Sequence, residues 1–560
     1  MDLRPASVLR WFFDPERGAS DRLLPRWLFL RALGLIYFSA FFSLIFQVRG
    51  LIGLDGILPA GEYLRAVTNS IGYARFWYAP TLLWFSTSNH ALMAVCWVGL
   101  LASVLVTVNI FPRGTLLLCF ICFLSFVSAS SDFSGYQSDG MLLEAGFLSL
   151  FLAPPGFRPG LGATSPPIRA SVFLLLWEWF RIYFESGVAK LASGDPEWRH
   201  FTAMDEYYQN GPLPTWIGWY AQHLPHGFHA ATAFATLALE LALVWMLFLP
   251  RRVRIICFFI VTPWQIGVIL TANYTFLNYL VLALAIFLLD DRFLARFFPS
   301  SWKARFLQQA KQIPATAYEL PAFDSPSLFP AATAETQVPA ALKSAHTWQR
   351  TLAHHLALVK IALTAVIFAC LFYSSTVLLL WMIWPGAPFP SSPVAALQPF
   401  RIADRYGLFA VMTRGRYEIE FQGSNDGQTW LAYTFRYKPQ NPYEAPRIYA
   451  PYQPRFDWNL WFASLGSWRS NPIVARTEER LLEGGADVLA LFAANPFPQQ
   501  PPKQVRAVLW QYWFTSLEEK RNQGLWWRRE LLGNYAPTLA RDTNGRIIAV
   551  EWPAELPPHE

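Results

Sequence analysis

The sequence predicts a polytopic α-helical membrane bundle of about nine spans, followed by a C-terminal extracytoplasmic β-rich (α+β) domain. The 560 residues are 54% hydrophobic and 17% aromatic but only 15% charged, which is too apolar for a soluble protein. Apolar runs long enough to cross a bilayer recur up to Trp384. Beyond that residue, alternating segments separated by turn residues replace them, and such segments are typical of strands.

These changes in composition divide the chain into five parts. A polar N-terminal segment that we place in the cytoplasm (1–26) precedes a membrane domain with about eight spans (27–289). A polar cytoplasmic linker (290–355) then leads into the last span (356–384) and the extracytoplasmic domain (385–560). The linker is rich in Ala and Pro and has few periodic apolar positions, so we expect it to be partly disordered.

The individual spans follow from the apolar runs in order. We expect them at 27–47, 91–111, 115–131, 140–153, from 170 onward, 228–249, 253–271, 274–289 and 356–384. Pro112–Gly114 is predicted to be a tight turn between the second and third spans. The aromatic stretch Tyr73–Phe85, which Pro80 interrupts, is predicted to be an interfacial or re-entrant element.

Lysine and arginine orient these spans. With nine spans and a cytoplasmic N-terminus, the inner connecting segments hold several times as many basic residues as the outer loops. The positive-inside rule then places the C-terminal domain outside the cytoplasm. The net charge of +7 does not indicate a nucleic-acid partner, because the basic residues lie between apolar runs and form no single patch.

Charged residues inside the spans form the main candidate site. Glu178 and Arg181 are three residues apart and Arg181 and Glu185 four apart, so one helix face can hold all three. The whole intramembrane polar cluster comprises Glu144, Glu178, Arg181, Glu185, Lys190 and Glu240. Charges at bilayer depth are costly and indicate a functional site. An ion-pair ladder that locks neighbouring helices explains the same residues, and both interpretations stay open.

No metal ion and no cofactor are predicted. Cys119 and Cys122 match a redox spacing, but they lie in an apolar run without a basic neighbour to lower a thiol pKa. Histidines recur at every third residue from His223 to His229, which is a spacing that metal ligands can have. Pro225 disturbs the helical register there, and no carboxylate adjoins the histidines in the sequence.

The C-terminal domain is predicted to contain a sheet and helices. Residues 417–421 and 430–437 read as two strands of a hairpin, with the turn at 424–428. Further strands are expected at 505–514 and 546–552, and helices at 457–465 and 473–492. Adjacent aromatic and basic side chains make a candidate client surface, or alternatively a packing cluster at the sheet edge: Trp526, Trp527, Arg528 and Arg529.

Several segments resemble, in order, the lipase maturation factor family. They are LRALGLIYF (30–38), LLEAGFLSLFLAP (142–154), SGVAKL (186–191), PLPT (212–215), WYAQHLP (219–225), YEIEFQGSNDG (417–427) and FDWNLWF (456–462). The resemblance implies a multi-span protein of the endoplasmic reticulum membrane whose lumenal C-terminal domain helps secreted dimeric lipases fold and assemble. Its implied partners are the lipid bilayer and an exported client protein, and such a factor needs no catalytic residue.

Two departures from the family affect the expected compartment. The outer domain contains no cysteine, and the one sequon, Asn273-Tyr-Thr275, lies too close to the bilayer for an oligosaccharide transferase to reach it. Both features fit a bacterial member of the family in the inner membrane, with its C-terminal domain in the periplasm.

An enzyme is the alternative hypothesis. The segment from Tyr183 to Leu191, followed by Trp198, is similar to the membrane segment of vitamin K-dependent carboxylases, in which a lysine at the place of Lys190 acts as a base. This resemblance implies an intramembrane carboxylase-like enzyme with Lys190 as its base beside Glu185. A lysine near the end of a span also commonly extends to the headgroups. A third hypothesis, a glycan-binding module, rests on the hairpin turn at 423–427, which is similar to turns in discoidin-type sandwiches.

Overall fold

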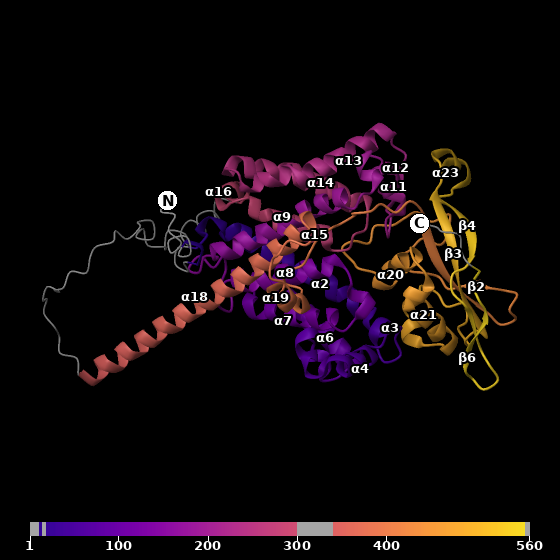
Figure 1. The fold of residues 1–560 in the computed structure, drawn as a ribbon, viewed down its shortest axis with the longest axis horizontal. Helices are drawn as coiled ribbons and strands as arrows, with labels where there is room; N and C mark the ends of the chain where they lie inside the picture. The colour runs from indigo at the N-terminus through magenta and orange to yellow at the C-terminus, as the bar shows by residue number, and fades with distance from the viewer. Residues whose placement is uncertain (1–10, 14–17, 299–339, 555–560) are drawn as a thin grey trace.

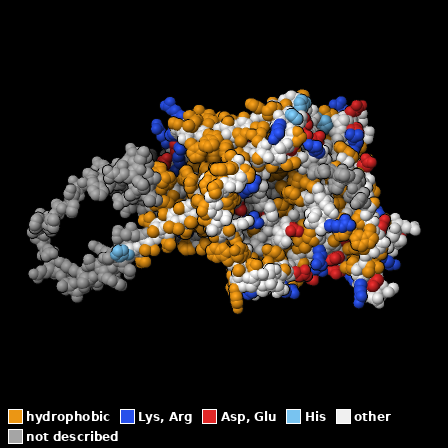
Figure 2. Space-filling view, in the orientation of Figure 1, with side chains coloured by type: hydrophobic (Ala, Val, Ile, Leu, Met, Phe, Trp, Pro, Cys, Tyr) orange, Lys and Arg blue, Asp and Glu red, His pale blue; other side chains and the backbone are white. Residues whose placement is uncertain are grey.

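The computed structural model describes residues 11–13, 18–298 and 340–554, and it places a helical part beside a sheet-containing part (Figure 1). Most of the linker predicted at 290–355 lies outside these ranges. Hydrophobic side chains cover much of the helical part, whereas charged side chains are more frequent over the sheet domain (Figure 2). The core is continuous, because one cluster of buried apolar residues extends from α2 (Leu23–Ile45) to β1 (Arg416–Ser424).

A helix occupies the place of each predicted span. Besides α2 these are α6 (Asn89–Thr107), α7 (Pro112–Val127), α8 (Gln137–Leu152), α9 (Arg169–Ala192), α13 (His226–Leu241), α14 (Arg251–Thr271), α15 (Leu277–Ala285) and α18 (Ala340–Ile383). Five helical stretches in the described residues are long and apolar enough to cross a membrane: Ser20–Ile45, Asn89–Thr107, His226–Phe248, Arg251–Thr271 and Val359–Ile383. The chain is therefore a multi-pass membrane protein. The described part holds fewer such candidates than nine because α7, α8 and α15 are short and α9 carries buried charges.

Short helices lie between the long ones and after α18. They are α3 (Val48–Ile52), α4 (Ala60–Ile71), α5 (Arg75–Tyr78), α10 (Pro196–Arg199), α11 (Ala203–Asn210), α12 (Trp216–Gln222), α16 (Asp291–Leu294) and α19 (Ser392–Leu397). The stretch predicted to be interfacial folds into α5 and neighbouring 3-10 turns. Its aromatic side chains point outward, since Tyr73 and Phe85 are each 89% exposed. Its position at the membrane surface stays a prediction.

The turn predicted at Pro112–Gly114 is instead the start of α7. Proline at the first helical position is favourable because the nitrogen there needs no intrahelical partner. Phe111, which precedes it, has a φ of 46° and reverses the chain direction after α6.

The C-terminal domain contains an antiparallel sheet. Its strands are β1, β2 (Leu431–Ala432), β3 (Gln504–Phe514), β4 (Trp527–Asn534), β5 (Thr538–Arg541) and β6 (Ile547–Glu551). The strand order is β2-β1-β3-β5-β6, with β4 also paired to β3. The predicted hairpin is present as β1 and β2, but β2 has only two residues because the chain leaves the sheet toward an irregular loop.

Helices cover the sheet at the side that faces the bundle (Figure 1). They are α20 (Arg455–Ser464) and α21 (Pro472–Glu483). The short helix α22 (Ala486–Leu489) contacts α3 of the helical part, and α23 (Leu517–Gln523) joins β3 to β4. The prediction of a single helix over 473–492 is wrong, because the helix ends at Glu483 and a second, short helix follows it. Gly484 there has a φ of 70°, a conformation that ends helices and favours glycine.

Candidate functional site

The intramembrane cluster contains a buried ion-pair group. Arg181 of α9 donates a short hydrogen bond to Glu144 of α8, and its second terminal nitrogen lies 3.8 Å from Glu185, one turn further along α9. All three side chains are at most 5% exposed. Glu178 is also buried, but neither of its carboxyl oxygens has a hydrogen-bond partner among the described residues. Glu178, Arg181 and Glu185 all belong to α9 at the spacing of one helix face, but only Arg181 and Glu185 form an ion pair there.

An irregular segment of the C-terminal domain, residues 401–413, lies across these charges, and we call it the strap. The main chain of the strap is bonded directly to the cluster. Arg181 donates to the carbonyl oxygen of Asp404 at 2.7 Å, and the amide of Tyr406 donates to Glu185 at 2.6 Å. The hydroxyl group of Tyr406 donates to Glu144 at 2.7 Å. The buried charges thus satisfy backbone groups that have no partner in a helix or strand.

Lys190 belongs to a second polar group along the same strap. Its Nζ donates to Glu240 of α13 and to the carbonyl oxygen of Leu408, each at 2.9 Å. Asp195 accepts from the amide of Met412 at 2.6 Å. A base needs a lone pair that is free to take a proton, whereas Lys190 is used here as a donor to two acceptors.

Space for the strap comes from a glycine in α8. A side chain at Gly140 would overlap the carboxyl group of Asp404, so a larger residue would push the strap away from the cluster. Phe409 has a φ of 55°, which is strained for a bulky residue and is held in place by its surroundings. The indole of Trp198 contributes, because its Nε1 donates to the carbonyl oxygen of Phe409 at 2.9 Å.

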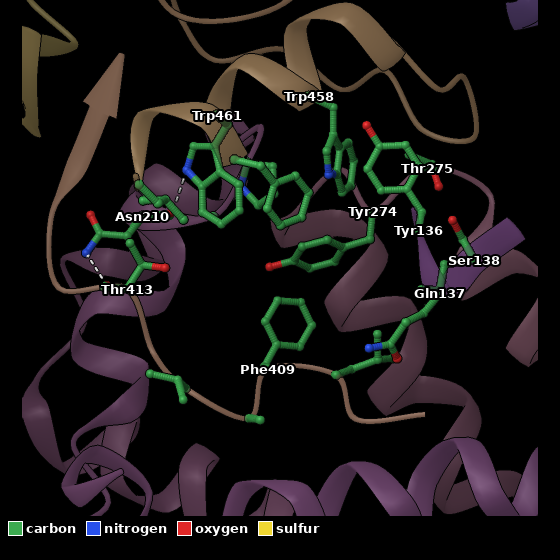
Figure 3. Close-up of a pocket in the computed structure, with 18 of the residues that line it drawn as sticks. Tyr136, Gln137, Ser138, Asn210, Tyr274, Thr275, Phe409, Thr413, Trp458 and Trp461 are labelled. Atoms are coloured by element: carbon green, nitrogen blue, oxygen red, sulfur yellow. Dashed lines mark hydrogen bonds between the residues drawn. The ribbon is translucent and has the colours of Figure 1, made fainter. Parts of the chain in front are cut away.

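An aromatic pocket of about 410 Å³ lies on the other side of the strap, between the bundle and α20 (Figure 3). The rings of Tyr274 and Phe409 are 4.8 Å apart, and Trp458 and Trp461 of α20 form the opposite wall. Trp461 donates to the carbonyl oxygen of Asn210 at 3.1 Å. The Nε1 of Trp458 is buried without a partner in the described residues. The pocket can therefore take an apolar or aromatic group that also accepts a hydrogen bond.

Sequence reasoning missed this pocket and the strap. Trp458 and Trp461 lie in the motif FDWNLWF, whose aromatic density was the available signal. Asp195 precedes Pro196 and caps α10, which is a recognisable helix start. The strap itself gave no signal, because it forms neither helix nor strand and its partners are distant in the sequence.

The candidate client surface is divided between buried and exposed positions. Trp527 is 1% exposed and packs on Phe514 with ring centroids 4.6 Å apart. The guanidinium group of Arg529 lies 4.2 Å from the ring of Trp510 and 3.3 Å from Glu420. Trp526 contacts the helical part, and Arg528 lies near Glu519 of α23. The ring of Trp526 packs on Trp219 of α12 at 5.1 Å, and the side chain of Arg528 is 61% exposed.

The histidines do not form a group of three metal ligands, and no such His, Cys, Asp and Glu group occurs in the described part of the chain. No carboxylate adjoins the histidines in the sequence, but the fold brings one to two of them. Asp205 of α11 lies 2.9 Å from Nδ1 of His226 and 2.8 Å from Nδ1 of His229. His223 instead contacts carbonyl oxygens, including that of Thr515 at 2.8 Å. Because Thr515 directly follows β3, this contact of His223 joins the helical part to the sheet domain.

Comparisons with known proteins cover both parts of the fold. Residues 24–296 match the model of the lipase maturation factor transmembrane domain, and residues 402–537 match that of the lipase maturation factor C-terminal domain. Lipase maturation factor 2 of Gallus gallus is 32% identical over 92% of this chain and 81% of its own length. Human lipase maturation factor 2 is 31% identical over 92% and 83%, and bovine lipase maturation factor 1 is 30% identical over 95% and 92%. No solved structure matches. Because identity at this level extends through both domains, the chain belongs to the lipase maturation factor family.

Proposed function

We propose that this protein is a membrane-anchored maturation factor that helps exported lipases fold and assemble. The observation that carries the proposal is the similarity to lipase maturation factors 1 and 2 along both the bundle and the sheet domain. The carboxylase-like alternative has no support from these comparisons. Lys190, its intended base, is bonded to Glu240 and to the strap.

The proposal requires a particular topology. We infer nine spans, a cytoplasmic N-terminus and linker, and an extracytoplasmic domain at 385–560. A helix at each predicted span and the excess of basic residues in the inner segments favour this arrangement. The membrane is the endoplasmic reticulum membrane in a eukaryotic cell or the inner membrane in a bacterium, and the domain faces the export compartment in either case. A reporter fused after Glu560 should therefore be active only when it functions outside the cytosol.

The aromatic pocket is the part of the surface best suited to hold a client. It opens at the junction of the two domains, and its wall is continuous with exposed apolar residues. Val411 is 66% exposed and Phe462 is 47% exposed, and both line the pocket. A partly folded lipase exposes apolar side chains that a mature lipase buries, so an aromatic pocket can distinguish the two states. Trp526 and Arg528 do not line this pocket and stay a separate candidate surface on the sheet domain.

Co-expression with an exported dimeric lipase tests the function. Cells that lack their own maturation factor should secrete lipase of high specific activity with the full-length chain and of low activity when residues 385–560 are deleted. The result that overturns the function is equal lipase activity with and without the full-length protein.

The pocket is tested separately with Val411→Arg, which places a charged side chain at the pocket opening. A matched control is Val550→Arg on β6, because Val550 is 47% exposed and does not line the pocket. We expect Val411→Arg to lower secreted lipase activity severalfold and Val550→Arg to leave it unchanged. Equal activity of the two variants would assign the client to another surface without affecting the proposed function.

A further inference from the structure

A second cavity, of about 460 Å³, lies within the helical part between α9, α13, α14 and α15. This volume is in the range of about 300–1,000 Å³ that small-molecule sites occupy. Leu408 and Phe409 of the strap close the end of the cavity that faces the aromatic pocket. The two cavities are therefore neighbours on either side of the strap. The aromatic pocket borders the C-terminal domain, whereas the second cavity lies among the helices of the bundle.

The outer wall of this second cavity faces the bilayer. It is formed by α13 and α14. In the most apolar stretches of these two helices, only 28% and 17% of the residues are buried inside the protein. Phe234 and Phe259 on these helices are 60% and 55% exposed. In Figure 1 both helices lie at the outer edge of the bundle, and hydrophobic side chains cover this edge in Figure 2. An occupant of the cavity would thus come from the hydrocarbon phase.

The wall of the cavity carries one unsatisfied polar atom among the described residues. Glu240 Oε1 accepts a hydrogen bond from Lys190, but Glu240 Oε2 is buried without a partner in the described residues. Other polar groups in this wall are paired. The hydroxyl group of Tyr183 donates to Gln265 at 2.8 Å, and Gln265 donates to Asn278 at 2.7 Å. The group that the cavity lacks is a hydrogen-bond donor.

The charges of the wall further restrict the ligand. Lys190 and Glu240 neutralise each other, so the cavity offers no net positive charge to an anionic headgroup. A phosphate beside the free oxygen of Glu240 would be repelled, whereas a hydroxyl group could donate to it. Leaving that oxygen unpaired at bilayer depth is costly, so a donor that enters with an apolar body is favoured.

We propose that this cavity binds one neutral lipid alcohol, whose hydroxyl group donates to Glu240 and whose apolar body lies beside Tyr183 and Trp264. Diacylglycerol, a sterol and a prenol share this chemistry. Because Phe409 lines both cavities, a bound lipid would also support the strained part of the strap and, through it, the wall of the aromatic pocket.

The test is lipid binding to the full-length protein in nanodiscs, followed by native mass spectrometry. Dioleoylglycerol, cholesterol and farnesol are titrated separately, and the strongest binder identifies the source of the hydroxyl group. Trioleoylglycerol, which has no hydroxyl group, and dioleoyl phosphatidic acid, which is anionic, are the matched comparisons. We expect at least one alcohol to bind about 10-fold or more tightly than either comparison lipid, which is the effect of one hydrogen bond to a charged acceptor.

Two variants locate the binding. Glu240→Gln replaces the free acceptor with a donor and should remove the preference for the alcohol. Gly267→Phe should block entry, because Gly267 lines the cavity, is exposed, and has open space where a side chain would lie. Gly227→Phe is its control, since Gly227 has equally open surroundings on α13 but does not line the cavity. Equal binding of alcohol and triester, or unchanged alcohol binding by Gly267→Phe, would overturn the proposal.

Discussion

The main-chain amide of Tyr406 donates a 2.6 Å hydrogen bond to the carboxylate of Glu185, which is 221 residues earlier in the chain. The bond joins the C-terminal domain to α9, the helix at the place of the fifth predicted span. The carboxylate of Glu185 accepts this one hydrogen bond through Oε2, while its Oε1 lies 3.8 Å from Arg181 and has no hydrogen-bond partner among the described residues. Glu185 therefore has a structural use in holding the strap. We interpret Arg181, Glu144, Glu185 and Lys190 as a binding surface for the strap, because each of them is bonded to it. This interpretation extends the ion-pair ladder to include main-chain groups of the strap.

Tyr406→Phe should loosen the strap without disturbing its packing. The substitution removes only the hydroxyl group that donates to Glu144 at 2.7 Å. Because that bond ends on a charged acceptor, we expect the free energy of unfolding to fall by about 1.5–3 kcal/mol. Thermal unfolding of the detergent-purified protein measures the loss, and cleavage by trypsin at Arg405 reports whether the strap opens. Tyr443→Phe is the control because Tyr443 is 64% exposed. If both variants unfold alike, the strap is not held by this bond.

Asp139 and Arg455 join the two domains, and their coupling can be measured. Arg455 of α20 donates to both carboxylate oxygens of Asp139 of α8, at 2.7 and 2.8 Å, and both side chains are at most 1% exposed. Removing either partner leaves a buried charge, so each single alanine variant should cost about 3–5 kcal/mol. The double variant should cost clearly less than the two losses added together.

The control for this cycle is the exposed pair of Glu444 and Arg447, which are 3.8 Å apart and at least 60% exposed. Its alanine variants should change the unfolding free energy by less than about 1 kcal/mol. Additive losses at Asp139 and Arg455 would show that the two residues act independently and that the domains are held together elsewhere.

The helices could be predicted from the sequence far better than their contacts. Apolar runs such as that of α14 have one stable arrangement in a bilayer, because every backbone group must be bonded within the segment. The first and third strands were also predictable from their composition. In contrast, β4 was missed because Trp527–Asn534 contains three consecutive charged residues and a glycine, and its pairing with β3 supplies the order that its own residues do not favour.

The same distinction applies to the candidate site. The contact of Arg181 with Glu185 follows from helical spacing and was predictable. The contacts of Arg181 with Asp404 and of Lys190 with Leu408 were not, because they use carbonyl oxygens of an irregular segment more than 200 residues away. A carbonyl oxygen is the same in every residue, so the sequence gives no sign of which one an arginine or lysine will meet.

Asn273 is expected to carry no glycan in the folded protein, even when the chain is made in a eukaryotic cell. Its side chain is 2% exposed, donates to Arg447 at 2.8 Å, and accepts from the amide of Tyr449 at 2.7 Å. Endoglycosidase treatment of the folded protein should leave its mobility on a gel unchanged. Asn273→Asp should lower the unfolding free energy by about 1–3 kcal/mol, since a carboxylate cannot donate to the carbonyl oxygens that Asn273 meets. Asn425→Asp in the exposed hairpin turn is the control. A glycan on folded, active protein would contradict the buried position.

Glu478 should make the sheet domain less stable as the pH rises. It lies on α21 against the sheet and is 0% exposed, and burial raises its pKa well above the ordinary value of 4.5. Although the main chain at Ala507 lies nearby, no well-formed hydrogen bond reaches either carboxyl oxygen among the described residues. Between pH 4.5 and the raised pKa, the folded state holds a proton that the unfolded state has released. Stability from this group is therefore largest below pH 4.5 and is lost as the pH rises through the folded pKa.

Two substitutions at this position separate the titration from the packing. Glu478→Gln should flatten the difference in melting temperature between pH 5 and pH 8, because the amide does not titrate. Glu478→Leu should raise the free energy of unfolding at neutral pH by about 1–4 kcal/mol, as replacement of buried ionic groups by apolar side chains often does. Glu483→Gln, at a more exposed position of the same helix, should change neither quantity. A wild-type protein whose pH dependence matches that of Glu478→Gln would mean that the carboxyl group is hydrated or paired in solution, and the buried position of its side chain against the sheet would then be incorrect.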